Sequence, residues 1–348
     1  MNHCQINCLI PVEYVYPDIP TPPLASGIFL PVVNSHCPGP DVWMKQNGGS
    51  EPEMAFVQTI LESGNQGSKL IDMDLSNLGV RMKDCSGYGI DFIRIGAEGR
   101  DDNILNREVS FFTDHSPLVM FEILPGDFFR PELVRAFKSM GYDSYRFIPG
   151  LECLAPIPTG NDPDPYCSNA FCCKPDRAAM LERNGFLTYQ ETETNSDGNT
   201  DPTLWINYVQ QFPYAIRLLR MWQHYLLENE GDSCWRLYQE ALSSYAISRM
   251  TQVPKADRLQ ALNRAYLVLR EVIRKNPTFS RLMSLSRVVS DMGYQKQKDI
   301  VLEHLIGMME MSDPISIAEP FLAVSSRFEQ TDPEQEVGKW CLSSLLEN

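Results

Sequence analysis

The stretch IDFIRIGAEG, residues 90–99, carries the strongest evidence for the fold. Its first six residues form a short, mostly apolar run, and Glu98 follows within a glycine-containing turn. Such a run is typical of a strand buried on both faces of a sheet. A second run, SPLVMFEI at residues 116–123, contains Glu122. Because ligands of open α/β sheets bind beyond the carboxyl ends of the strands, we expect Glu98 and Glu122 at a ligand pocket. The alternative is that Glu98 only caps the following helix.

Helices and further strands alternate around these two runs. The expected elements are helices at residues 51–62, 131–141 and 175–185 and strands at residues 145–149 and 169–173. Proline opens the second and third helices and glycine closes them, which is the usual arrangement at helix ends. This alternation predicts an α/β fold with a largely parallel sheet.

The rest of the chain divides into three further parts. Residues 1–50 are rich in Pro, Gly and Cys and form an irregular N-terminal segment, while residues 191–203 carry almost no apolar side chain and form a linker. Residues 204–348 are helical throughout, because apolar side chains recur there at spacings of three and four. Pairs of helices of this length favour a tetratricopeptide-like bundle or short solenoid. We expect this helical domain to fold on its own, since the linker offers few contacts.

The composition excludes several classes of partner. The chain has 348 residues, with 30 Lys and Arg against 45 Asp and Glu, and a formal charge of −15. Nucleic acid and anionic membranes are therefore not expected as partners, since both require clustered basic side chains. No apolar run is long enough to span a bilayer. No basic residue precedes Lys45, so a secretory signal is not expected either.

The ten cysteines are expected to be reduced thiols in the cytoplasm. Cys172 and Cys173 follow an apolar residue, and we interpret them as small buried side chains. Four residues near the N-terminus are of the types that bind zinc, but their spacing fits no standard finger, so no metal site is predicted: Cys4, Cys8, His36 and Cys37. The run Asp114-His115-Ser116 contains the residue types of a hydrolytic triad, but sequence neighbours seldom form one.

Residues 50–185 resemble the C-terminal half of FkbM-type methyltransferases. In that family a strand ends Lys-Ile-Asp-apolar-Glu-Gly, a later strand reads Pro-apolar-apolar-Glu, and a Gly-Tyr precedes the last strands. IDFIRIGAEG, SPLVMFEI and Gly141-Tyr142 are similar to these three motifs. The resemblance implies a Rossmann-like sheet that binds S-adenosylmethionine and methylates a hydroxyl of a sugar or related small molecule.

The family's first motif, Val-Ile-Asp-apolar-Gly-Ala-Asn-x-Gly, is a strand that turns tightly into a helix. LIDMDLSNLGV at residues 70–80 is similar to it if one residue is inserted, and the resemblance then assigns Asp72, Asn77 and Gly79 to the cofactor. Asp74 stands where the motif has its first glycine. In an alternative alignment, residues 71–75 match a Leu-Asp-Asp-Leu segment just before the Glu-Gly strand, and the cofactor motif is absent.

Two further departures concern the length of the sheet and its chemistry. Only residues 80–89 separate the first motif from IDFIRI, whereas three βα units would need roughly 90 residues. The predicted domain, residues 51–190, is thus a truncated Rossmann-like methyltransferase sheet. Gly96 replaces the family's Asp and Arg94 its Lys. Glu98 is therefore our first candidate for the base or substrate-orienting group, and Glu122 the second.

Two functions follow from this sequence. The first is an S-adenosylmethionine-dependent O-methyltransferase of the FkbM type, with a small-molecule or glycan hydroxyl as acceptor. The alternative is a catalytically degenerate relative that acts through its helical domain as an interaction or scaffold protein. Affinity for the cofactor at residues 72–79 distinguishes the two.

Overall fold

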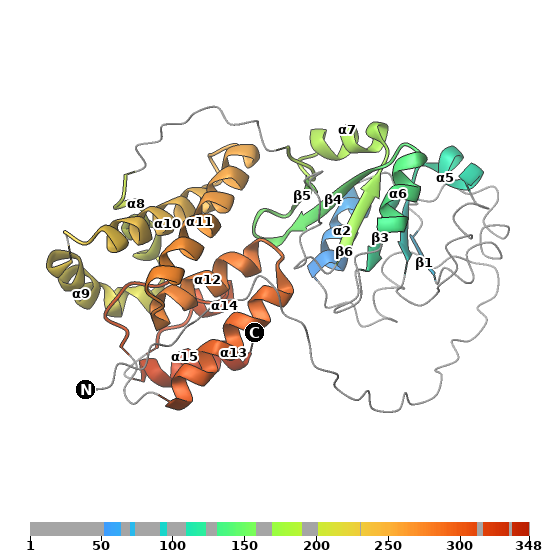
Figure 1. Ribbon diagram of the computed structural model, residues 1–348. Helices are drawn as coiled ribbons and strands as arrows, with labels where there is room; N and C mark the ends of the chain where they lie inside the picture. Colours follow the sequence, from blue (N-terminus) through green and yellow to red (C-terminus); the bar gives the residue numbers. More distant parts are fainter. Residues whose placement is uncertain are drawn as a thin grey trace, which may run out of the picture.

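The computed structural model describes residues 52–63, 70–73, 91–95, 109–122, 131–157, 169–189, 201–229, 231–311, 316–333 and 336–347. These residues form an α/β part followed by a helical part, which lie side by side (Figure 1). No helix among them is long and apolar enough to cross a membrane.

The α/β part contains a mixed sheet. Six strands in the described residues have the order β1-β2-β3-β6-β4-β5. They are β1 (Leu70–Met73), β2 (Phe92–Ile95), β3 (Leu118–Glu122), β4 (Asp143–Ile148), β5 (Cys153–Pro156) and β6 (Asn169–Cys173). β1, β2 and β3 are parallel, β6 is antiparallel to both of its neighbours, and β5 is antiparallel to β4. β4 therefore runs in the same direction as β1–β3.

The prediction of a largely parallel sheet is wrong for the half that contains β6, β4 and β5. The strands at residues 90–95, 118–123, 145–149 and 169–173 are confirmed to within two residues at each end. β5 has no counterpart in the prediction. It pairs with β4 through the tight turn at η2 (Pro149–Leu151), and such a hairpin forces an antiparallel partner.

Helices cover both faces of the sheet. α2 (Pro52–Ser63) and α7 (Pro175–Arg183) pack on one face, and α5 (Val109–His115) and α6 (Pro131–Ser139) pack on the other. The helix predicted at residues 51–62 is confirmed, with the apolar side chains of α2 in the core. Gly141 and Gly185, which follow α6 and α7, have φ angles of +83° and +75°. Glycine adopts this left-handed conformation without strain, which explains why both helices end there.

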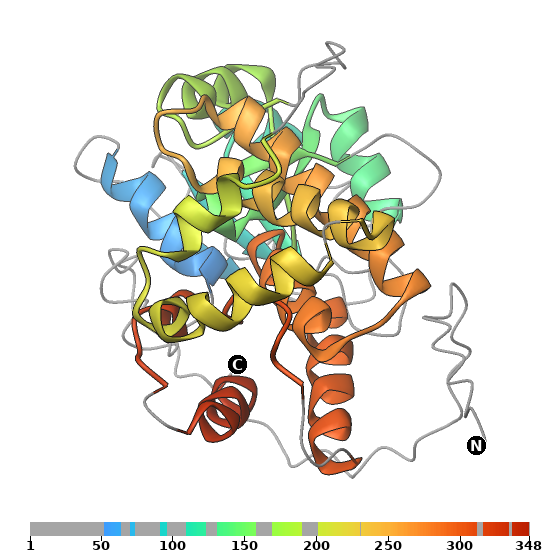
Figure 2. The ribbon, with the colours of Figure 1, turned by 90° about the vertical axis from the view of Figure 1, so that its left-hand side faces the viewer.

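The helical part contains eight helices in the described residues. They are α8 (Leu204–Val209), α9 (Pro213–Glu228), α10 (Ser233–Arg249), α11 (Lys255–Lys275), α12 (Phe279–Asp291), α13 (Gln295–Met311), α14 (Ser326–Glu329) and α15 (Val337–Leu346). α10 to α13 pack successively, each on the next, and α15 lies beside α13 (Figure 2). Pro213 begins α9 rather than interrupting a longer helix, as its missing N–H allows at a first turn.

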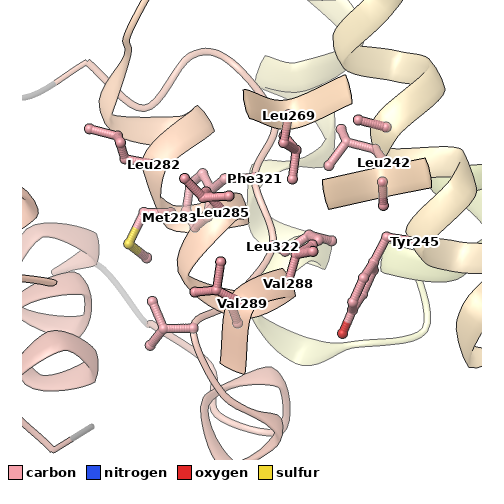
Figure 3. Packing of buried hydrophobic residues seen from close by; sticks show 14 of the residues in the cluster. Leu242, Tyr245, Leu269, Leu282, Met283, Leu285, Val288, Val289, Phe321 and Leu322 are labelled. Carbon is pink, nitrogen blue, oxygen red and sulfur yellow. The ribbon is translucent and has the colours of Figure 1, made fainter. Parts of the chain in front are cut away.

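A single apolar core joins these helices (Figure 3). Leu242 of α10, Leu269 of α11 and Leu285 of α12 point toward one another there, and Phe321 and Leu322 enter from the segment after α13. Four tryptophans of this core are between 0% and 7% exposed: Trp205, Trp222, Trp235 and Trp340.

Residues 316–325 form neither helix nor strand and bend at Glu319, Val324 and Ser325, although residues 204–348 were expected to be helical. This segment crosses the helical part with its backbone bonded to side chains of the surrounding helices. Tyr238 donates to the Pro320 carbonyl at 2.7 Å, Tyr214 donates to the Phe321 carbonyl at 3.1 Å, and Ser284 accepts from the Leu322 N–H at 2.9 Å. These hydrogen bonds replace the backbone hydrogen bonds of a helix, so residues 316–325 can be buried.

The helical core continues into the end of the sheet. Four buried residues around η2 belong to it: Ile148, Leu151, Cys153 and Ala155. Basic side chains also cross this joint to backbone carbonyls. Arg146 of β4 donates to Met292 at 3.3 Å, Arg249 of α10 donates to Gly150, and Lys255 of α11 donates to Gly185 at 2.6 Å. Apolar contacts and hydrogen bonds from charged side chains therefore both connect the two parts.

Candidate functional site

The carboxyl ends of β1, β2 and β3 meet at one edge of the sheet, because the three strands are parallel. This is the edge at which open α/β sheets bind ligands. Neighbouring strands lie about 4.8 Å apart, so the edge from β1 to β6 spans about 14 Å.

The strand register places polar residues in rows near this edge. Asp72 of β1 is level with Arg94 of β2, which is level with Met120 of β3. Two rows further on, toward the carboxyl end, Glu122 of β3 is opposite Asn169 of β6. Glu122, one of the two acidic residues predicted for this edge, is therefore the last residue of β3. Asp72, which the family resemblance assigns to the cofactor, is next to the last residue of β1.

The remaining predicted site residues lie outside the described residues. Glu98, Asn77 and Gly79 are among them, as are the two departures from the family pattern, Asp74 and Gly96. Their roles stay predictions.

Arg94 lies on the same sheet face as α2. Phe92 packs in the core beneath α2, whereas Ile93 and Ile95 pack on the opposite side, and side chains alternate along a strand. Arg94 is half-buried there. Arg94 is one residue before Ile95, which forms the last pair of β2 with β1. The guanidinium group of Arg94 is always charged.

Asn169 and Glu53 belong to this edge and were not predicted. The Asn169 Nδ2 donates to Glu53 Oε1 at 3.3 Å, which ties the first turn of α2 to the start of β6. The Oδ1 of Asn169 is buried and has no hydrogen-bond partner. The only signal in the sequence was a polar residue at the start of the apolar run 169–173.

The cysteines and the triad-like run do not form a second site in the described residues. Cys172 and Cys173 are 0% exposed, and burial raises the pKa of each thiol to about 12, so both are inert at neutral pH. This confirms their interpretation as small buried side chains. Ser116 Oγ donates to Asp176 at 3.2 Å and the His115 ring packs on Phe111, so no triad forms.

No group of three or more His, Cys, Asp or Glu side chains in the described part of the chain is arranged to hold a metal ion. The zinc-type residues near the N-terminus, Cys4, Cys8, His36 and Cys37, lie outside that part.

Comparisons with known proteins give no relative. No family model matches the chain, and neither a curated protein nor a solved structure matches it.

Proposed function

We propose that this protein is an S-adenosylmethionine-dependent methyltransferase of the FkbM type that methylates a hydroxyl group. One observation carries the proposal: β1 runs parallel to β2 as its direct neighbour, and Asp72 is near the carboxyl end of β1. The aligned first motif requires a strand of this direction at this position.

The order of the strands supports the interpretation as half of a larger sheet. From β1 through β2 and β3 to β4, every crossover moves in the same direction across the sheet. In a doubly wound sheet the crossovers reverse at the switch point, which is where ligands bind. Among the described strands, β1 is at the end of this series, so a reversal would occur on the side of β1 that faces away from β2. This agrees with the proposal that the missing βα units belong next to β1.

The placement of β1 also bears on the choice between the two alignments. In the first alignment residues 70–73 are the strand of the cofactor motif, and Leu70–Met73 is a strand paired in register with β2. We therefore favour the first alignment, in which Asp72, Asn77 and Gly79 bind the cofactor. A strand-end carboxylate such as that of Asp72 can accept hydrogen bonds from amino and hydroxyl groups.

The proposed reaction forms a bond between the acceptor oxygen and the methyl carbon, breaks the methyl–sulfur bond and leaves that electron pair on sulfur. S-adenosylmethionine, when bound, supplies the methyl group and the leaving sulfur. The chain has to hold the hydroxyl in line and accept its proton as the new bond forms. Glu98 is the first candidate for that base and Glu122, at the end of β3, is the second.

The assignment of Asp72 is tested by measuring the affinity for S-adenosylhomocysteine, the reaction product, in two variants. We expect Asp72→Asn to weaken binding about 10-fold or more, since a charge-assisted hydrogen bond contributes about 1.5–3 kcal/mol. Asp114→Asn is the matched control, because Asp114 is an exposed carboxylate on α5. Equal affinities in both variants would remove Asp72 from the cofactor site.

The alternative proposal, a degenerate relative that acts through its helices, is favoured by Asp74. A negative side chain where the motif has glycine opposes close approach of a cofactor. Successive packing of α10 to α13 is also how arrays of helix pairs are built, which supports the tetratricopeptide-like interpretation. If the enzyme proposal is right, Asp74→Gly should increase cofactor affinity. Unchanged affinity would favour the alignment in which Asp74 lies outside the cofactor loop.

A further inference from the structure

We propose that the protein forms a symmetric dimer in which α11 of each copy packs across α13 of the other copy. The exposed faces of these two helices carry opposite charge, and each has one large exposed apolar side chain, Leu267 on α11 and Ile300 on α13. The inference concerns the helical part and is independent of the proposed function.

The exposed face of α11 is basic, although the chain as a whole has a formal charge of −15. Leu267 is 58% exposed on this face. Arg270 and Arg274 follow it at spacings of three and four residues, which places all three side chains on one side of the helix. Both arginines are exposed, and the Arg270 guanidinium lies 5.3 Å from the centre of the Tyr266 ring. An exposed leucine is therefore bordered by two fixed positive charges.

The exposed face of α13 is acidic. Ile300 is 49% exposed, Asp299 directly precedes it and Glu303 follows three residues later, and both carboxylates are exposed. Lys296, one turn before Ile300, is half-buried, so the carboxylates outnumber the ammonium group on this face. An exposed isoleucine is therefore bordered by negative charge.

These charges are not neutralised within one copy. Glu271, the acidic residue beside the α11 arginines, already pairs with Lys275 at 2.7 Å. In the part of the chain that the structure describes, Arg274 and Glu303 form no ion pair. Each face thus keeps charge that a partner of opposite sign can pair with.

The two faces adjoin each other. The Tyr266 hydroxyl of α11 donates to Gln297 Oε1 of α13 at 2.8 Å, and the Tyr266 ring packs on Tyr294 with the ring centres 5.3 Å apart. Leu267 directly follows Tyr266, and Ile300 lies about one turn after Gln297. Both exposed apolar side chains are therefore close to the contact between α11 and α13.

A second copy of this chain supplies the complement of both faces. A two-fold axis between α11 and α13 brings α11 of each copy onto α13 of the other, because a two-fold interface pairs the same two patches twice. Leu267 then packs on Ile300 of the partner subunit, and Arg270 and Arg274 lie beside Glu303 of the partner subunit. Opposite charges favour this register, and like charges oppose the packing of α11 on α11.

The size of the two faces predicts a weak dimer. α11 and α13 have 21 and 17 residues, which corresponds to lengths of about 32 and 26 Å. Two crossings of such helices bury an area at the lower end of specific interfaces, so we expect a Kd in about the micromolar range.

The first test is sedimentation equilibrium of the full chain. We expect the average mass to rise with concentration from 39.6 kDa toward twice that value. Added salt should weaken the dimer, because exposed charges are screened. A mass that stays at 39.6 kDa throughout the micromolar range would overturn the proposal.

The second test reverses the charge of each face in turn. We expect Arg270→Glu with Arg274→Glu, and Asp299→Arg with Glu303→Arg, each to weaken self-association about 10-fold or more, because like charges then face each other. An equimolar mixture of the two variants should dimerise again, since every face then meets one of opposite charge. Arg183→Glu, at an exposed residue of α7, is the control and should leave association unchanged.

The mixture shows whether α11 faces α13. A mixture that associates no more tightly than either variant alone would contradict this arrangement, even if the wild-type chain is a dimer. The Tm of each variant, measured alongside, shows that the variant is folded.

Leu267→Ser tests the apolar contact separately. Because Leu267 is mostly exposed in one copy, we expect its loss to change the Tm by no more than about 2 °C and to weaken self-association about 10-fold. Unchanged association of this variant would contradict the packing of Leu267 on Ile300 of the partner subunit.

Discussion

At the scale of single residues, two glycines have the same backbone conformation but different surroundings. Gly141 and Gly293 both have positive φ angles, +83° and +77°. A Cβ at Gly141 would meet nothing within 4 Å, whereas one at Gly293 would lie 2.9 Å from the Phe147 carbonyl oxygen at the end of β4. The two positions share the same conformational demand and differ in their surroundings.

Replacing each glycine by alanine separates these effects. We expect Gly141→Ala to lower the free energy of unfolding by about 1–2 kcal/mol, the cost of a left-handed alanine. Gly293→Ala should cost about 1–3 kcal/mol more, because the Phe147 backbone has to move. Urea denaturation measures both values. Equal losses would mean that β4 does not constrain the turn after α12.

Glu329 provides a prediction about pH. Its Oε1 lies 3.2 Å from Arg287 Nη2 and accepts from the Tyr208 hydroxyl at 3.2 Å, and Asp291 and Arg249 also interact with it electrostatically. Burial is the main cause that raises its pKa above the usual 4.5, and the nearby guanidinium groups oppose this shift. The folded state therefore binds the proton more tightly than the unfolded state.

A raised pKa of Glu329 means that its contribution to stability is fully present below about pH 4.5 and is lost as the pH rises through the folded-state pKa. We expect the decrease in the free energy of unfolding over this window to be shallower in Glu329→Gln. Glu347→Gln is the control, because Glu347 forms an exposed ion pair with Arg327. Identical pH profiles for wild type and Glu329→Gln would contradict this account.

At the scale of elements, short apolar runs and helix-ending glycines predicted most of the α/β part correctly. The runs at residues 90–95 and 118–123 are strands because strands buried on both faces need apolar side chains at every position. Strand direction could not be predicted in the same way. β6 enters between β3 and β4 and runs against both, and this choice depends on chain connections rather than on its residues.

For a similar reason, the sequence did not predict the irregular segment at residues 316–325. Its apolar side chains are typical of a core helix. The hydrogen bonds that satisfy its buried backbone groups come from Tyr214, Tyr238 and Ser284, which are far away in sequence. Pro320 is a local sign that a helix does not continue through this segment, but it does not predict these distant hydrogen bonds.

Tyr238 tests the role of these bonds. Its hydroxyl is 2.7 Å from the Pro320 carbonyl oxygen and 2.7 Å from Ser284 Oγ. We expect Tyr238→Phe to lower the free energy of unfolding by about 1–3 kcal/mol, because the Pro320 carbonyl stays buried without its donor. Tyr189→Phe, which removes a hydrogen bond to Tyr145 at a residue that is 41% exposed, should lower stability less. Equal effects of the two variants would contradict this role for Tyr238.

In the candidate site, too, some residues could be predicted from the sequence and others could not. Glu122 was predicted because strand ends can be recognised in the sequence and parallel strands bring such ends together, whereas Asp72 was assigned only by the family resemblance. Asn169 could not be predicted, because its amide is oriented by a hydrogen bond to Glu53 of α2, which is 116 residues away in sequence.

At the scale of the whole molecule, buried side chains and hydrogen bonds around η2 connect the two parts. The composition of the linker predicted an independent helical domain. However, Ile148, Leu151, Cys153 and Ala155 complete the helical core, and Arg146 and Lys255 bridge the parts through backbone carbonyls. A fragment of residues 201–348 would expose the apolar surface that these four residues cover.

We therefore expect one calorimetric unfolding transition for the full chain, and a clearly lower Tm or no cooperative transition for the fragment 201–348. A fragment with the Tm of the full chain would restore the two-domain interpretation and leave the joint without an energetic role.

The central claim, that the edge beside β1 binds S-adenosylmethionine, is tested most directly by calorimetric titration of the full chain with S-adenosylhomocysteine. The account predicts saturable binding of one equivalent, with a Kd in about the micromolar range. No binding by a sample that unfolds cooperatively would contradict it, and the helical part would then be the place to look for the function.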